Sequence, residues 1–207
     1  MLQLKTIHNE TFELLNELSA VNELDSFALA GGTALALQLG HRISVDLDFL
    51  TEKTFDSLAL FERLTEFLDV ENTSTAVNSL SLFIQRKESS VKTVFVRHNY
   101  PRLKPLLVVG DIRLFSLEDI AAMKLNAVAN RGAKKDFYDI HALLTIFSLS
   151  ELIGFFEKKY QKMNSFTVVK SLAYFDDADL EPDPMSLMES PWDQIKVDIH
   201  QALRNSV

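Results

Sequence analysis

The sequence predicts a mixed α/β (α+β) fold in which a β-sheet flanked by helices is followed by a C-terminal helical bundle. Short apolar and alternating segments lie between residues 27 and 109, whereas apolar residues recur at helical spacing after residue 116. A chain of 207 residues is long enough for a small sheet domain with a helical appendage. We place these domains at residues 1–115 and 116–207, and we expect the second to complete the cleft of the first.

The composition excludes several kinds of site. The chain contains no cysteine, so it has no disulfides, thiolate metal sites or cysteine nucleophiles, and metal ligands must be oxygen or imidazole. The formal net charge of −8 argues against a surface that coats nucleic acid generally, although local basic strips remain possible. Two such strips comprise Arg97, His98, Arg102 and Lys104, and then Lys124, Arg131, Lys134 and Lys135.

No segment has the form of a membrane span, a signal peptide or a lipidation motif. We therefore expect a cytoplasmic protein with no membrane partner. Residues 2–24 carry apolar side chains at helical spacing and predict an amphipathic helix. Its polar face is not basic, so we expect this helix to pack on the core and not on a lipid surface.

A glycine pair joins the first expected strand of the core to its first helix. Phe27–Ala30 is a short apolar run that ends at Gly31 and Gly32, as a buried strand does where the backbone turns sharply. Thr33 can cap a short helix that Gly40 closes. The N-terminus of this helix presents N–H groups and a positive dipole end, which suit a phosphate, although paired glycines also occur in ordinary turns.

Two carboxylates follow at a spacing of two residues. Ser44–Phe49 alternates polar and apolar residues and predicts a strand. Asp46 and Asp48 then project from one face, while Val45 and Leu47 pack on the other. Two acids so close repel each other, and a dication is the simplest compensation. The pair therefore predicts a site for Mg²⁺ (or Mn²⁺), unless it is a solvated strand edge.

Further strands are expected between residues 69 and 97, after a helix that begins at Asp56 or Ser57. The segments concerned are rich in β-branched and aromatic residues. They comprise Thr75–Val77, Leu80–Gln85 and Val91–Val96. Residues 98–110 then form a loop that ends in a short strand, Leu106–Val109, and the basic residues of this loop either face a nucleic acid or are simply solvated.

The first helix of the bundle carries a lysine on its apolar side. Ser116 can cap a helix that runs to Asn130, with Asp119 three residues after the cap. At 100° per residue Lys124 falls near the centre of the apolar arc. A lysine is rarely buried without a partner, so Lys124 either forms a structural ion pair or meets an anion.

The next helix repeats this feature with an acid. Lys134–Phe147 has an apolar stripe, and Asp136 lies on it near the N-terminus. Asp136 either favours the helix dipole or, together with Lys124, reaches one shared cleft. The remaining helices are expected at Glu151–Tyr160, Ser165–Phe175 and Trp192–Leu203.

Two sets of residues resemble a known family. Gly31–Thr33 with Asp46–Phe49 resembles the minimal nucleotidyltransferase fold of the polymerase-beta superfamily. Phe115–Ala127, followed by Arg131–Ile140, is similar to the AbiEii/AbiGii family of nucleotidyltransferase-like toxins from abortive-infection and type IV toxin–antitoxin systems. The resemblance covers residues 25–147.

The resemblance implies a metal-dependent nucleotidyltransferase that moves a nucleoside monophosphate from a nucleoside triphosphate to an acceptor hydroxyl. It implies tRNA or another RNA as acceptor and an antitoxin protein as partner. The implied roles of the residues are as follows: Asp46 and Asp48 hold Mg²⁺ (or Mn²⁺), Gly31, Gly32 and Thr33 cradle phosphates, Ser44 adds a hydrogen bond, Lys124 contacts phosphate, and Asp136 orients or deprotonates the attacking hydroxyl. Asp139 is expected to be supporting and Tyr138 structural.

One position departs from the family pattern. Typical members have aspartate where this chain has Val94, and no acid lies between residues 91 and 110. Two carboxylates suffice for one Mg²⁺ that the triphosphate also binds, but a third usually completes a two-metal site. Two alternatives therefore stay open: a degenerate nucleotide-binding module, and a phosphotransferase that modifies a protein hydroxyl.

Overall fold

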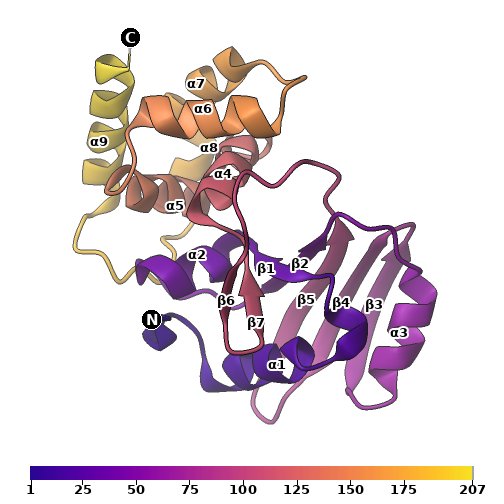
Figure 1. Cartoon of the computed structure of the whole chain (residues 1–207). Coiled ribbons are helices and arrows are strands. Elements are labelled where there is room, and N and C mark those ends of the chain that lie inside the picture. The colour runs from indigo at the N-terminus through magenta and orange to yellow at the C-terminus, as the bar shows by residue number, and fades with distance from the viewer. Residues whose placement is uncertain (207) are drawn as a thin grey trace.

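The computed structural model describes residues 1–206, except the side chain of Asn72 (Figure 1). Within this range seven strands form one mixed sheet in the order β3-β4-β5-β2-β1-β7-β6. The strands are β1 (Ala28–Ala30), β2 (Leu47–Thr51), β3 (Val70–Ala76), β4 (Ser79–Gln85), β5 (Ser90–Arg97), β6 (Leu107–Val109) and β7 (Ile112–Leu114). Strand β2 is antiparallel to β1 and parallel to β5. The mixed α/β fold predicted from the sequence is confirmed.

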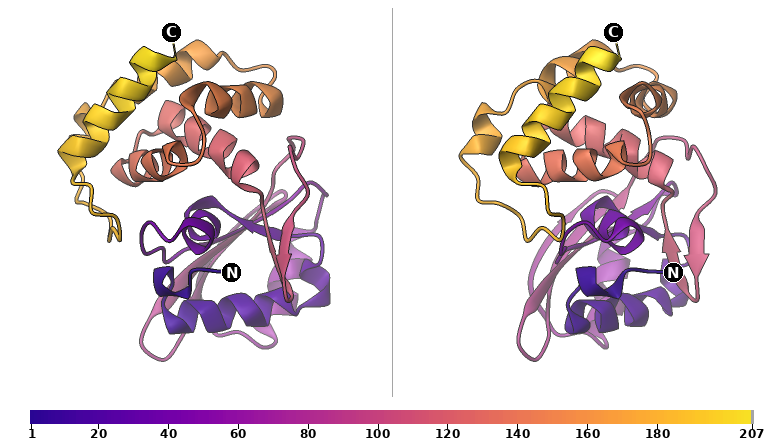
Figure 2. Two further views of the ribbon diagram at one scale, coloured as in Figure 1. Left: turned by 60° about the vertical axis from the view of Figure 1, so that its left-hand side comes forward. Right: turned by 90° about the vertical axis from the view of Figure 1, so that its left-hand side faces the viewer.

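The helices fall into two groups. Helices α1, α2 and α3 belong to the sheet half, and α4 to α9 gather at the other end of the molecule, as the two turned views also show (Figure 2). The helices are α1 (Asn9–Ser19), α2 (Gly31–Leu39), α3 (Ser57–Thr65), α4 (Leu117–Asn130), α5 (Lys134–Leu144), α6 (Leu149–Lys159), α7 (Ser165–Leu172), α8 (Asp176–Asp179) and α9 (Trp192–Asn205). Helix α2 contacts both α4 and α5 and so joins the two groups.

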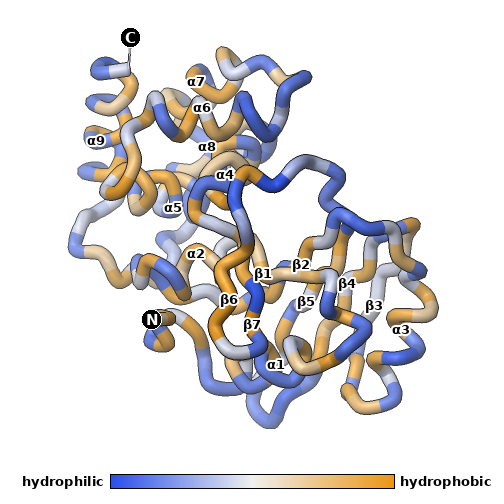
Figure 3. Tube along the Cα trace, viewed as in Figure 1, coloured by the Kyte–Doolittle hydropathy of each residue, from blue (hydrophilic) through white to orange (hydrophobic). Residues whose placement is uncertain are grey.

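The apolar periodicity explains how these elements pack. On β4 the side chains of Leu80, Leu82 and Ile84 are buried while their neighbours are not, and α3 contacts this strand. On α9 hydrophilic and apolar residues alternate along the tube (Figure 3), and the buried ones are Ile195 and Ile199. One cluster of buried apolar residues runs from the sheet through α2 into the bundle.

Two predicted boundaries change. The expected strand Ser44–Phe49 begins only at Leu47, because the Ser44 amide donates to the Thr6 carbonyl at 2.9 Å and not to a neighbouring strand. Val45 is consequently 44% exposed and not packed as predicted. Helix α2 begins at Gly31, so Thr33 does not cap it.

The N-terminal helix is shorter than predicted, whereas three predicted helix-capping residues are confirmed. The expected helix over residues 2–24 is a single α-helix only at α1, with short 3₁₀ turns on each side. Asp56 caps α3 and Ser116 caps α4 as predicted, and Gly40 closes α2 at φ +77°.

Among residues 1–206 no single helix has the length and apolar composition to cross a membrane. Helices α5 and α6 reach that composition only as a pair, and they are bent by 114° at their junction.

Candidate active site

A cleft of about 410 Å³ lies between the sheet half and the helical bundle. Four parts of the chain line it. The first is the turn into α2 with the start of β2 and the segment before it, and the second is one side of α4 with the start of α5. The third is the segment around Met185, and the fourth is β5, through Lys92. The residues predicted from the sequence that line it are Gly31, Gly32, Ser44, Asp46, Asp48 and Lys124.

The two glycines are required by close approach of other groups. Gly31 has a φ of +66°, a conformation that residues with a Cβ rarely adopt. A Cβ at Gly31 would overlap the carboxylate of Asp48, and a Cβ at Gly32 would overlap the guanidinium of Arg42. Both glycines therefore keep the N-terminus of α2 open towards the cleft, where bare N–H groups favour an anion.

Asp46 and Asp48 share the cleft without a cation of their own. Burial, and then the neighbouring Asp46, raise the pKa of the Asp48 carboxyl, and Lys124 offsets only part of this effect. Among the described residues Arg42, Lys124 and Arg131 form ion pairs with Asp136 or Asp139 and not with this pair. A carboxylate pair short of positive charge has the oxygen donors that a hard divalent ion prefers.

Thr33 and Ser44 fix the segment that carries these acids. The hydroxyl of Thr33 donates to the backbone carbonyl of Asp46 and lies 2.9 Å from the Ser44 hydroxyl, from which it can accept. Thr33 is buried and does not line the cleft, whereas Ser44 does. The structure thus places Thr33 as a support beneath the two acids.

Lys124 extends from α4 to a fully buried carboxylate on α5. Its ammonium lies 2.6 Å from Oδ2 of Asp139 and 3.1 Å from Oδ1 of Asp136. Arg42 binds Asp139 through two nitrogens, at 2.7 and 3.0 Å, and His41 Nε2 lies 2.7 Å from the same carboxylate. Against the effect of burial, Lys124 and Arg42 hold the pKa of Asp139 well below its ordinary value.

Asp136 lies behind the cleft and not on its surface. It is 0% exposed, and Arg131 donates to both of its oxygens, at 2.7 and 2.9 Å. Although burial opposes it, the hydrogen bonds of Arg131 and the charge of Lys124 lower the pKa of Asp136. The carboxylate holds two cations in place, one of which, Arg131, is exposed at the cleft.

Two cations that line the cleft, Arg42 and Lys92, were not predicted from the sequence. They accompany Arg131 and Lys135, which belong to the second basic strip. A further wall comes from residues 184–187, where the Ile43 amide donates to the Met185 carbonyl at 2.8 Å. Nothing in the local sequence pattern relates this segment to residues 41–43. The only available signal for Arg42 was its position between the glycine turn and the two acids.

The two basic strips differ in their surroundings. In the first strip Arg97 and Arg102 both bind Glu52, and this strip does not line the cleft. In the second strip three residues line the cleft, but Lys134 is buried against Asp183 at 3.1 Å.

Val94, where the resemblance implies a third acid, lies next to the carboxylate pair. Val94 lies directly opposite Asp48 in the parallel pairing of β2 with β5. The only acids that line the cleft among residues 1–206 are Asp46 and Asp48, and this range contains no cluster of three or more histidines or acids that could hold a metal ion.

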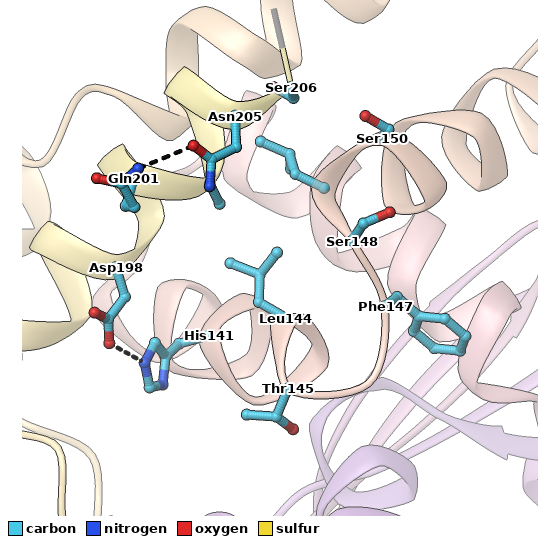
Figure 4. Close-up of a pocket in the computed structure, with 12 residues that line it drawn as sticks. His141, Leu144, Thr145, Phe147, Ser148, Ser150, Asp198, Gln201, Asn205 and Ser206 are labelled. Atoms are coloured by element: carbon cyan, nitrogen blue, oxygen red, sulfur yellow. Dashed lines mark hydrogen bonds and ion pairs between the residues drawn. The ribbon is translucent and has the colours of Figure 1, made fainter.

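A second hollow of similar volume, about 420 Å³, lies between α5, α6 and α9 (Figure 4). Its described lining carries one charged pair, His141 with Asp198 at 2.8 Å, beside neutral side chains such as Ser148 and Asn205. It lacks the set of cations and paired acids that a polyphosphate with its metal needs. The cleft at Asp46 and Asp48 is therefore the candidate active site.

Comparison with known families decides the class of this site. The family model described as "Nucleotidyl transferase AbiEii toxin, Type IV TA system" matches residues 13–104 and 88–205. The chain belongs to this AbiEii family. The predicted nucleotidyltransferase class is thereby confirmed.

Relatives of this AbiEii-family chain agree in sequence and in fold. The chain is 35% identical over 191 residues to "Uncharacterized protein aq_aa25" of Aquifex aeolicus, which covers 86% of this chain and 91% of that protein. The crystal structure of JHP933 from Helicobacter pylori matches with a TM-score of 0.62 at 18% identity, over 97% of this chain and 93% of that one. MenT4, a nucleotidyltransferase toxin from Mycobacterium tuberculosis H37Rv, matches with a TM-score of 0.51 at 14% identity, over 96% and 86% of the chains.

Proposed function

We propose that this AbiEii-family chain uses a divalent metal ion to transfer a nucleoside monophosphate from a nucleoside triphosphate to an acceptor hydroxyl. The observation that carries the proposal is the pair Asp46–Asp48, which shares one cleft with the glycine N-terminus of α2 and with cations from α4 and α5. Oxygen ligands, backbone N–H groups and cations together suit a triphosphate with its metal ion.

Asp46 and Asp48 would hold Mg²⁺ (or Mn²⁺), since they are acids without a cation of their own. When bound, the ion neutralises phosphate charge. The N–H groups at Gly31 and Gly32 face the phosphates, and Lys124 and Arg131 offset further charge from the opposite wall.

The transfer is an in-line displacement at the α-phosphorus. The acceptor oxygen forms a bond to the α-phosphorus, and the bond from that phosphorus to the oxygen that bridges to the β-phosphate breaks. Pyrophosphate leaves with the electron pair of the broken bond, and the proton of the acceptor hydroxyl passes to water. The chain's own residues bind, orient and neutralise charge in this scheme.

The buried position of Asp136 favours a positioning role over the role of base predicted from the sequence. A base has to come within about 3 Å of the hydroxyl it deprotonates. Both oxygens of Asp136 accept hydrogen bonds from cations, and its pKa is lowered, which weakens it as a proton acceptor. We propose that Asp136 holds Lys124 and Arg131 at the cleft.

We propose tRNA or another RNA as acceptor and an antitoxin protein as partner. The family description names a type IV toxin–antitoxin system, which supports the partner. Arg131 and Lys135 are exposed residues that line the cleft, and exposed cations at the cleft would attract an RNA phosphate.

The test incubates the protein with each of the four ribonucleoside triphosphates labelled at the α-phosphate, with Mg²⁺ or Mn²⁺, and follows label onto bulk RNA and onto protein. We expect label on RNA from the wild type and none from Asp46→Ala. A parallel reaction with γ-label distinguishes a phosphotransferase, which would label a protein hydroxyl. Metal-dependent nucleotide binding without any transfer would contradict the proposal and favour a degenerate binding module.

A further inference from the structure

We infer that Lys92 supplies the positive charge that a second metal ion would otherwise supply, so that this site works with one divalent ion. The inference rests on the proposed function and concerns a residue to which neither the sequence pattern nor the family match gives a role. It follows from the register of β5, from the charges of the cleft and from the identity of residue 94.

The register places Lys92 beside the carboxylate pair. Strand β5 runs parallel to β2 with Val94 opposite Asp48 and Thr93 opposite Leu47. Side chains two residues apart on a strand share a face, so Lys92 and Val94 both lie on the face that carries Asp48. Lys92 is exposed and lines the cleft with Asp46 and Asp48.

The ligands for a second ion are absent from this face. Two-metal sites hold their ions about 4 Å apart and need several shared carboxylates. The described lining of the cleft offers Asp46 and Asp48 alone, and Val94 has no donor atom. An ammonium on the same face repels a second dication and so disfavours its binding.

A lysine is chemically suited to this substitution. Its ammonium is a compact charge on a flexible stem with three donors. Among the cations of the cleft, Lys124 and Arg42 are committed to Asp139, and Arg131 to Asp136. Neither Lys92 nor Lys135 takes part in the ion pairs of the described residues, and of the two only Lys92 lies on the strand that pairs with β2. We therefore assign Lys92, and not Lys135, to the α-phosphate of a bound triphosphate. Its charge then opposes the charge that develops on the transferred phosphate.

The test counts metal ions directly. Mn²⁺ is titrated into the full chain with a triphosphate whose α–β bridging oxygen is a methylene, and free Mn²⁺ is measured by electron paramagnetic resonance. We expect one bound Mn²⁺ per wild-type chain. Two bound ions per chain would overturn the inference while leaving the proposed transferase intact.

Variants test the role of the charge. We expect Lys92→Met to lower kcat by roughly 100-fold and to weaken metal-free triphosphate binding by about 10-fold, whereas Lys92→Arg keeps most of both. The matched control is Lys87→Met in the turn between β4 and β5, an exposed lysine that does not line the cleft. A Lys92→Met protein that behaves like the control would overturn the inference, and a wild type that transfers nothing would overturn the proposed function with it.

Discussion

Two ionic clusters in this chain pair lysine with buried aspartate, and they differ in their balance of charge. In one, Lys159 on α6 lies 2.7 Å from Asp119 on α4, and both side chains are fully buried. Asp119 also accepts from the backbone amides of Leu103 and Lys104, at 3.0 and 3.2 Å, so the pair fastens the loop after β5 to the bundle. Both charged side chains of this cluster are therefore paired with groups of the same chain.

The other cluster borders the cleft and carries an excess of cations. Lys124, Arg42 and Arg131 surround two carboxylates, Asp136 and Asp139, while the unpaired acids Asp46 and Asp48 lie across the cleft. Burial therefore does not distinguish a structural ion pair from a functional one. The two clusters differ in charge balance: the charges of Lys159 and Asp119 neutralise each other, whereas Asp46 and Asp48 at the cleft lack a cation. We propose that a bound metal ion and triphosphate complete the charge balance of the cleft.

The largest expected effect comes from a variant that breaks the ion pair of Asp119 with Lys159. Asp119→Ala should lower the free energy of unfolding by about 3–5 kcal/mol, because it leaves Lys159 buried without a counter-charge. Urea denaturation followed by circular dichroism measures this loss. The adjacent Glu118→Ala should cost less than about 1 kcal/mol, and equal costs for the two variants would contradict the structural role.

Two glycines with positive φ, Gly31 and Gly132, give the next comparison. Ala at Gly31 or at Gly132 has to adopt a positive φ, so each variant should lose about 1–2 kcal/mol of stability. Only Gly31→Ala also displaces the Asp48 carboxylate, whereas the Cβ at Gly132 meets nothing nearer than a carbonyl 3.6 Å away. Transfer rates should fall at least 10-fold for Gly31→Ala and stay near wild type for Gly132→Ala. Equal rates in the two variants would argue against an open turn at the phosphates.

Removing an acid of the cleft should slightly stabilise the protein. The pKa of Asp48 is raised in the folded chain, so its charged form costs folding free energy at neutral pH. Asp48→Asn should raise the free energy of unfolding and abolish metal-dependent nucleotide binding. Thermal unfolding with and without Mg²⁺ and triphosphate measures both effects. A destabilised Asp48→Asn protein would show that the pair serves the fold.

The last prediction concerns the pH dependence that His98 gives to stability, beside the ion pair of Asp119 with Lys159. Burial, and then the charge of Lys159, lower its pKa to about 4. The unfolded state binds the proton near pH 6.5 and the folded state only near pH 4, so stability falls as the pH drops through this window. Denaturation midpoints at pH 7 and pH 5 should differ less in His98→Phe than in the wild type. An unchanged difference would assign the pH dependence to other groups.

The sequence predicts those parts of the site that depend on local patterns. The glycine turn, the spacing of Asp46 and Asp48, and the place of Lys124 on an apolar arc are all visible within single elements. The link from Arg42 to Asp139 joins residues 97 positions apart, and no periodicity reveals it. The same holds for the contact of Ile43 with Met185. The prediction that the strand begins at Ser44 was wrong, because the Ser44 amide donates to the Thr6 carbonyl and not to a neighbouring strand.

One pair of variants tests most directly whether the cleft cluster serves a ligand and the other cluster serves the fold. Triphosphate affinity, measured calorimetrically with Mg²⁺, and the free energy of unfolding are determined for Lys124→Met and Lys159→Met. The account predicts that Lys124→Met loses affinity at least 10-fold with little loss of stability, since Arg42 and Arg131 still face Asp139 and Asp136. For Lys159→Met we predict a loss of stability with triphosphate affinity close to that of the wild type. A Lys124→Met protein that binds triphosphate as tightly as the wild type would contradict it.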